Sequence, residues 1–164
     1  MKRNLLKTLA VACVTSVMLM GCGNTGSAED NSSKGNTITV TDVRVNVEIP
    51  ADPQRIVDLS GNSDILSILG YDVVGTANSD AYDYTKFPSY LEETLKGAEI
   101  LGYSMQDTMD VEAVMNLNPD LIVISTVQEK MYDQLSEIAP TVMLQLEALN
   151  WKDDVKALAK VFDK

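Results

Sequence analysis

The most regular pattern of hydrophobic and polar residues in the chain lies at residues 108–128. Its first half predicts a helix that begins after an N-cap at Asp110 and ends before Pro119, which disfavours helical backbone at the preceding residue. Three apolar residues share one face of this helix: Val111, Val114 and Met115. The apolar run Leu121–Ile124 is too short for a helix and predicts a strand at the sheet centre, covered on both faces and followed by a loop at 125–128.

Similar units repeat along the chain. Apolar residues alternate with polar ones on both sides of Asp42, which predicts a β-hairpin over residues 38–49. Beyond it, predicted strands are 56–59, 71–76, 99–101, 121–124 and 141–144, and predicted helices are 65–69, 90–95, 111–115, 131–139 and 151–162. We therefore expect an α/β fold: a Rossmann-like parallel sheet with helices on both faces, preceded by a β-hairpin.

The first 36 residues differ from the rest. A basic start and a short apolar run predict a signal peptide at residues 1–21, and its end resembles a bacterial lipobox with Cys22 as the lipid-modified residue. An ordinary cleaved signal with an incidental cysteine is the alternative. Diacylglycerol on Cys22 would anchor the protein to a membrane, and residues 22–36 predict a flexible tether reaching on the order of 20 Å.

Composition excludes several classes of function. The net charge of −11 makes nucleic acid an unfavourable partner. The chain has no histidine, and its two cysteines, Cys13 and Cys22, both lie in or next to the leader. Imidazole-dependent metal sites, thiol chemistry and histidine-based catalysis are thus unavailable, so we expect neither a metal site nor an enzyme.

The last predicted helix, at 151–162, has no glycine or proline stop before Lys164. This pattern predicts a continuation beyond the sequence. A complete domain with a frayed last helix is the alternative.

Three stretches carry a family resemblance: PQRIVDLSGNSDILSILG at 53–70, LGYSMQDTMDVEAVMNLNPDLIVIS at 101–125, and LSEIAPTV at 135–142. Together they resemble the N-terminal lobe of the substrate-binding proteins of ABC importers for ferric siderophores, haem and cobalamin. The resemblance implies two lobes joined by a long helix, with the ligand between them. It assigns residues 37–149 to the first binding lobe and 150–164 to the start of the interdomain helix, with the second lobe missing.

The resemblance also implies a function. The protein would capture an iron–siderophore complex at the extracytoplasmic face of the bacterial membrane, without a cofactor, and deliver it to an ABC permease and its ATPase. Haem, cobalamin, or a non-transport role as a sensory or scaffold lipoprotein remain alternatives. No basic residue occurs in the predicted ligand loops except Lys86 and Lys130 at their margins, which favours a weakly anionic ligand such as a hydroxamate or mixed siderophore unless a second lobe supplies cations. Haem would need an iron ligand, for which Tyr103 and Met105 are candidates.

Ligands of open α/β sheets bind beyond the carboxyl ends of the strands, here at residues 60–62, 77–84, 102–106 and 125–128. The family takes its contacts from the first, third and fourth of these loops. The predicted ligand-binding residues are therefore Ser60, Gly61, Asn62, Tyr103, Ser104, Met105, Gln106, Thr126, Val127 and Gln128. Helix capping by Ser60 or Asn62 and packing of Tyr103 are the alternative roles. For Tyr82 and Tyr84, the pattern favours covering apolar surface over stacking on a ligand.

In the family, a glutamate near the start of the helix predicted at 111–115 docks onto arginines of the permease. Glu112 matches that position. Favourable interaction with the helix dipole, worth about 0.3–1 kcal/mol, is compatible with the same role.

Overall fold

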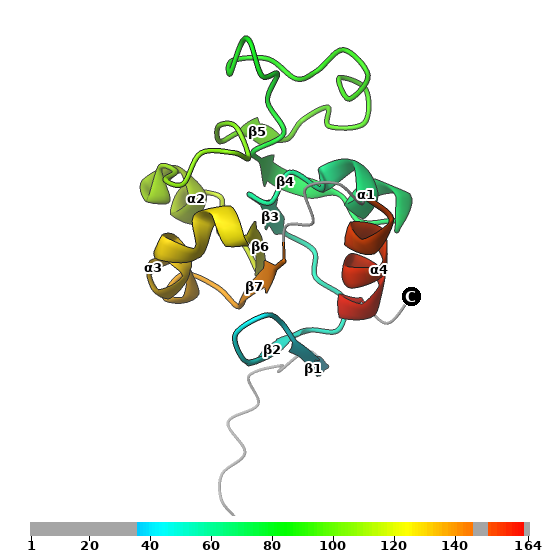
Figure 1. The fold of residues 1–164 in the computed structure, drawn as a ribbon, viewed down its shortest axis with the longest axis vertical. Coiled ribbons are helices and arrows are strands. Elements are labelled where there is room, and N and C mark those ends of the chain that lie inside the picture. The colour runs from blue at the N-terminus through cyan, green and yellow to red at the C-terminus, as the bar shows by residue number, and fades with distance from the viewer. Residues whose placement is uncertain (1–35, 146–150, 163–164) are drawn as a thin grey trace, which may run out of the picture. The chain divides into compact units, whose positions relative to one another are not determined.

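The computed structural model describes residues 36–145 and 151–162 (Figure 1). The predicted signal peptide, Cys22 and nearly all of the tether lie outside these residues. The elements are, in order, β1 (Thr37–Thr41), β2 (Asn46–Pro50), β3 (Ile56–Asp58), α1 (Ser63–Ile68), β4 (Val73–Thr76), β5 (Glu99–Ile100), α2 (Val111–Asn116), β6 (Leu121–Ser125), the 3-10 helix η1 (Thr126–Met131), α3 (Tyr132–Ser136), β7 (Thr141–Leu144) and α4 (Trp151–Val161).

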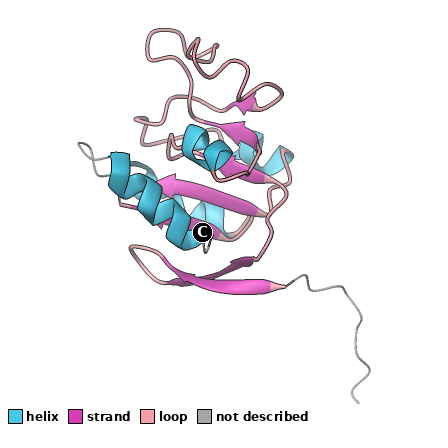
Figure 2. Ribbon diagram, turned by 90° about the vertical axis from the view of Figure 1, so that its right-hand side faces the viewer, coloured by secondary structure: helices cyan, strands magenta, loops and turns pink. Residues whose placement is uncertain are grey.

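The strands form two sheets, as predicted. β1 and β2 make an antiparallel hairpin, and the other five strands form a parallel sheet in the order β5-β4-β3-β6-β7. β3 occupies the middle position of that sheet and β6 lies beside it, so the prediction that residues 121–124 form the centre was wrong by one strand. Because all five strands are parallel, their carboxyl ends share one edge of the sheet (Figure 2).

Alternating side chains of the central strands enter two separate cores. Leu121 and Val123 face a core completed by α1, α4 and the hairpin, whereas Ile122 and Ile124 face a core completed by α2, η1 and α3. Residues 121–125 are all buried, as expected for a strand covered on both faces. Helices thus cover both faces of the sheet, which confirms the predicted α/β architecture (Figure 1).

The hairpin turn is joined to the edge strand β7 through Asp42. One carboxylate oxygen of Asp42 accepts the N–H groups of Arg44 and Val45, both at 2.7 Å, and shapes the turn. The other oxygen accepts the N–H of Met143 at 3.0 Å. The turn therefore satisfies backbone groups on the otherwise open edge of the sheet.

Some local predictions were wrong. Residues 90–95 form turns instead of a helix, because the short stretch between Pro88 and Gly97 closes only single helical turns, including one from Leu95 N–H to Leu91 O. The predicted loop at 125–128 begins a 3-10 helix. Three apolar residues that were expected to pack are exposed: Ile68 (80%), Met115 (52%) and Trp151 (68%). Their helices turn only part of the predicted apolar stripe toward the sheet.

Along residues 36–145 and 151–162, no helix has the length and apolar character needed to cross a membrane.

Candidate functional site

Four loops meet at the carboxyl edge of the parallel sheet, one after each of β3, β4, β5 and β6. We call them the rim loops and define them as residues 59–62, 77–88, 101–109 and 125–131. Side-chain and backbone hydrogen bonds connect the first to the second and the third to the fourth. The predicted ligand-binding residues all lie on this rim.

The first rim loop folds around Asp58, a residue that sequence reasoning missed. Its carboxylate is completely buried and accepts four hydrogen bonds: from the N–H (2.9 Å) and hydroxyl (2.5 Å) of Ser60, the N–H of Asn62 (2.9 Å) and the hydroxyl of Ser63 (2.6 Å). Burial raises the pKa of this carboxyl, and the hydrogen bonds from Ser60, Ser63 and Asn62 partly offset the rise. The sequence signal that could have identified Asp58 is its position at the end of the buried strand, directly after the apolar residues Ile56 and Val57.

Asn62 occupies the N-cap position of α1, but its side chain makes no capping hydrogen bond. The amide oxygen of Asn78, on the second rim loop, accepts the N–H of Ser63 instead, at 3.2 Å. The Asn62 amide donates to the Ser60 hydroxyl at 3.0 Å. Asn62 is therefore the N-cap residue, as the alternative role had it, but neither its side chain nor that of Ser60 makes the capping hydrogen bond. Asn78, which accepts the N–H of Ser63, was another missed residue.

Asn78 also joins the first two rim loops, since its side-chain N–H₂ group donates to the carbonyl of Gly61 at 2.9 Å. Gly61 has φ of +86°, and a Cβ there would lie 2.6 Å from the Ser104 hydroxyl. Only glycine allows both this backbone conformation and the close approach of the third rim loop. The predicted residues Gly61 and Ser104 are thus brought together.

Gln128 joins the third and fourth rim loops from beneath. Its side-chain oxygen accepts the N–H and hydroxyl of Ser125, at 3.1 and 2.9 Å. Its N–H₂ group donates to the carbonyls of Ser104 (2.6 Å) and Gln106 (2.9 Å). Because Gln128 is 0% exposed, the structure places it below the rim surface, whereas its neighbours Thr126 and Val127 are half-buried.

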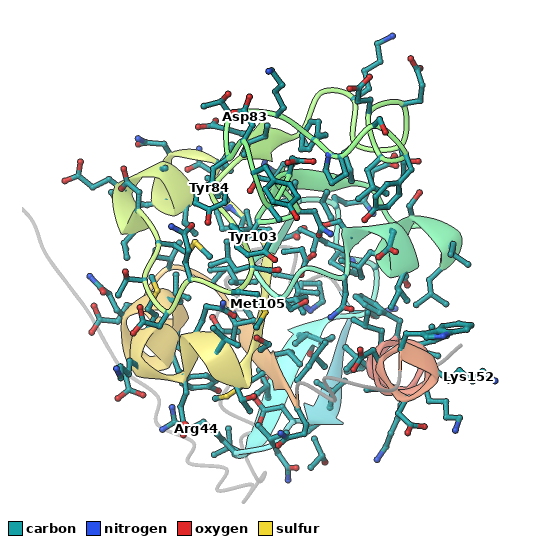
Figure 3. The ribbon with its side chains drawn as sticks, turned by 45° about the horizontal axis from the view of Figure 1, so that its top comes forward. Arg44, Asp83, Tyr84, Tyr103, Met105 and Lys152 are labelled. Carbon is teal, nitrogen blue, oxygen red and sulfur yellow. The ribbon has the colours of Figure 1, made fainter. Side chains whose placement is uncertain are left out.

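Aromatic residues line the part of the rim nearest β5. The rings of Tyr84 and Tyr103 stack with centroids 5.4 Å apart and planes 7° apart, and Figure 3 shows them next to one another. Tyr103 is half-buried and Met105 is 55% exposed. The exposed Gln106 accepts the N–H of Tyr103 through its side-chain oxygen at 2.8 Å. The third rim loop therefore presents two different side chains at the surface: Tyr103, which stacks on Tyr84, and the exposed Met105.

A shallow concavity lies between the first three rim loops and is lined by Gly61, Asn78, Ser79, Tyr82, Tyr90 and Tyr103, among others. Ser79 is 4% exposed, and its hydroxyl has no hydrogen-bond partner within the described part of the chain. Buried hydroxyls without a partner are rare and raise the free energy of the folded state. Ser79 was not predicted, and its sequence context carries no signal for this burial.

The two basic residues on the rim are both paired with acids. Lys86 lies 2.7 Å from Asp83, and Lys130 lies 3.4 Å from Asp107. The hydrogen bond from Lys86 lowers the pKa of Asp83 to about 2, and the same contact raises the pKa of Lys86. The described rim therefore offers no unpaired cation to an anionic ligand.

Glu112 lies apart from the rim-loop contacts, in the first turn of α2, and is exposed. The side chain of Asp110 caps this helix as predicted, accepting the N–H groups of Glu112 and Ala113 at 3.0 and 3.2 Å. A cap and an acidic first turn both stabilise the start of the helix. In the described residues, no group of three or more Asp, Glu or Cys side chains is placed to hold a metal ion.

Comparisons with known proteins found similar sequences and similar folds. A family model described as periplasmic binding protein matches residues 62–164. The chain is 37% identical to the probable siderophore-binding lipoprotein YfiY of Bacillus subtilis, over 90% of this chain and 46% of that protein. It is also 37% identical to the iron(3+)-hydroxamate-binding protein FhuD of B. subtilis, over 87% of this chain and 44% of that protein.

Among solved structures, Staphylococcus aureus SirA complexed with staphyloferrin B superposes with a TM-score of 0.68 at 34% identity, covering 78% of this chain and 43% of that chain. The chain thus spans about half the length of the curated relatives that it matches.

Proposed function

Because the chain belongs to the periplasmic binding protein family, we propose that it supplies one lobe of an extracytoplasmic substrate-binding protein that captures a ferric siderophore. The protein would deliver this complex to the permease of an ABC importer, powered by the ATPase of that importer. Three relatives support the ligand class. YfiY is described as a probable siderophore-binding lipoprotein, FhuD as an iron(3+)-hydroxamate-binding protein, and SirA was solved in complex with staphyloferrin B. Anchoring by diacylglycerol at Cys22 on the outer face of the cell membrane is part of the same proposal.

The observation that carries the proposal is the rim itself. Its loops come from four neighbouring parallel strands and are fixed to one another by Asn78 and Gln128, so their surface is organised before a ligand arrives. Preorganisation of this kind lowers the entropic cost of binding. The contacts would come from the exposed or half-buried members of the predicted set, with Gln128 positioning the third loop from below.

The charge of the rim favours a ferric hydroxamate over a triscatecholate. A ferric trihydroxamate core is neutral, whereas a ferric triscatecholate carries several negative charges. Lys86 and Lys130 are already paired, and Asp80 adds a further acidic group to the second rim loop. A highly anionic ligand would have to displace these carboxylates or depend on cations from another part of the protein.

Fluorescence quenching tests the ligand class in protein expressed from the complete reading frame. Ferrioxamine B, a trihydroxamate, is expected to quench tyrosine emission through Tyr84 and Tyr103 and to bind more tightly than ferric enterobactin, a triscatecholate. Haem and cobalamin complete the panel. Tighter binding of the catecholate would overturn the hydroxamate assignment, and no binding of any compound would overturn the function.

Glu112 is proposed to dock onto the permease. Replacing it with alanine should strongly reduce siderophore uptake by cells while leaving the ligand affinity of the purified protein unchanged, because the side chain is exposed on α2 and has no part in the rim-loop contacts. Uptake of radioactive iron and quenching titrations measure the two effects. Glu137→Ala, a change at another exposed glutamate, is the matched control and should affect neither. A parallel loss of affinity in Glu112→Ala would rule out a docking role.

A further inference from the structure

Asp58 is a completely buried ionisable residue that has no role in the proposed function so far. It ends the central strand β3, and its four hydrogen bonds all come from the residues just after it, up to Ser63. Each carboxylate oxygen accepts one backbone N–H and one hydroxyl. The first rim loop therefore closes around this single group.

The two backbone donors make the charge of this group important. A hydroxyl can rotate toward another acceptor, but the N–H groups of Ser60 and Asn62 are fixed by the path of the loop. A carboxylate offers strong acceptors on both oxygens. An amide at the same place offers one, and its N–H₂ group then faces a backbone N–H in either orientation, while protonation weakens acceptance at one oxygen.

Asp58 also influences the second rim loop through a chain of hydroxyls. Ser63 Oγ lies 2.6 Å from Asp58 Oδ2 and 2.6 Å from Thr76 Oγ1. Since an ionised carboxylate can only accept, Ser63 donates to Asp58. The single proton of the Thr76 hydroxyl then goes to Ser63 Oγ at 2.6 Å in preference to Asn78 Oδ1, which lies 3.2 Å from Thr76 Oγ1. Thr76 Oγ1 then accepts the N–H of Asn78 at 3.0 Å, and Asn78 donates to the carbonyl of Gly61 at 2.9 Å.

We propose that ionised Asp58 is a positioning residue that holds Gly61, Asn62 and Asn78 in the arrangement that receives the ligand. Asp58 itself does not touch the ligand. The inference rests on the proposed function, because it assumes that the rim binds the ligand. Its consequence is that the affinity of the rim depends on the protonation of a buried group beneath it.

Within the described residues, the groups that donate hydrogen bonds to Asp58 are polar but uncharged: Ser60, Asn62 and Ser63. Thr76 on β4 lies beyond Ser63, and β6 contributes the backbone carbonyl of Val123, which accepts the N–H of Leu59. Asp64, the first charged residue of α1, accepts the N–H of Ile65 and makes no hydrogen bond to Asp58 in the described structure. Burial is the largest cause of that shift and raises the pKa above 3.8.

Affinity and stability should therefore respond to pH in opposite directions. Because folding raises the pKa of Asp58, its contribution to stability is fully present below the unfolded pKa and is lost as the pH rises through the folded pKa. Ligand affinity should instead be lost as the pH falls through the folded pKa, because protonation weakens the acceptor that shapes the loop. A residue that merely stabilised the fold would not separate the two responses.

The first experiment needs no ligand. NMR titration of the protein should show the Asp58 carboxyl carbon and the amide signals of Ser60 and Asn62 changing with one common midpoint above 3.8. Amides that do not follow the carboxyl would overturn the positioning role, even if Asp58→Asn failed to fold.

The second experiment measures affinity with the chromium(III) complex of desferrioxamine B, whose slow ligand exchange prevents loss of the metal in acid. As the pH falls from neutral through the folded pKa of Asp58, the unaltered protein should lose affinity, whereas Asp58→Asn should bind about tenfold or more weakly at neutral pH and show a flat pH profile. An Asp58→Asn variant that binds normally would overturn the inference. If the unaltered protein does not bind the complex, the hydroxamate assignment fails, while the NMR titration still decides the role of Asp58.

Asp120→Asn is the matched control. The Asp120 carboxylate likewise accepts two backbone N–H groups, from Gln54 at 2.7 Å and Arg55 at 2.9 Å. It directly precedes β6 and so lies at the amino ends of the strands, away from the rim loops. This variant should leave the affinity and its pH profile unchanged. An equal loss of affinity in both variants would mean that general destabilisation explains the effect.

Discussion

Replacing Gln128 with leucine is expected to lower the free energy of unfolding by about 2–4 kcal/mol. The side chain is 0% exposed and makes four hydrogen bonds, two with Ser125 and one each with the carbonyls of Ser104 and Gln106. Leucine has a similar volume but no polar atoms. The variant would therefore remove the acceptor of the buried Ser125 N–H and the donor to the carbonyls of Ser104 and Gln106, and each of these groups that water does not reach destabilises the folded state.

Urea denaturation followed by circular dichroism measures this loss. Gln134→Leu is the matched control, because Gln134 lies on α3 and is exposed, and it should change the free energy of unfolding by less than about 0.5 kcal/mol. Gln128→Leu should also weaken siderophore binding, since the third rim loop loses its two hydrogen bonds to the Gln128 side chain. A Gln128 variant as stable as the control would mean that the loops are held by other contacts.

Replacing Ile122 with alanine should have a comparable or larger effect on stability, about 2–5 kcal/mol. Ile122 is completely buried in β6 and belongs to the core that α2, η1 and α3 complete. Truncation removes apolar contacts and leaves a cavity between the sheet and these helices, which rigid neighbours cannot fill.

The same change at Ile68 is the control, because that side chain is 80% exposed on α1. Alanine also favours helix more than isoleucine does, so Ile68→Ala should be neutral or slightly stabilising. Urea denaturation of both variants gives the two changes in the free energy of unfolding, provided that the dependence of this free energy on urea concentration is the same in both. Similar losses in both would contradict the assignment of Ile122 to a rigid core.

The two predictions concern two kinds of contact made by β6 and the loop after it: apolar contacts in the core and hydrogen bonds beneath the rim. The apolar residues of β6 hold the helices against the sheet, and the polar residues at its end hold the loops against one another. A core substitution should therefore lower stability without changing ligand contacts while the protein remains folded. A substitution under the rim should change both, because hydrogen bonds at fixed geometry shape the binding surface.

Much of the fold could be predicted because its signals are local. Period-two alternation identified the hairpin, the Asp110 cap and Pro119 defined α2, and the apolar run at 121–124 identified a strand covered on both faces. Each signal depends on neighbours within a few residues. Where the local signal was short, as at 90–95, the prediction was wrong, because one or two turns of helix depend on tertiary packing.

The sequence by itself therefore determined most of the element types, the parallel α/β architecture and the set of loops that form the rim. Only the tertiary structure decided how these loops are fastened: Asp58 beneath the first, Asn78 between the first and second, and Gln128 beneath the third. The physical reason is that these hydrogen bonds depend on which strands become neighbours and on which polar groups burial leaves in need of partners. Residues such as Gln128 and Ser104, 24 positions apart, meet only because β5 and β6 end at the same edge of the sheet.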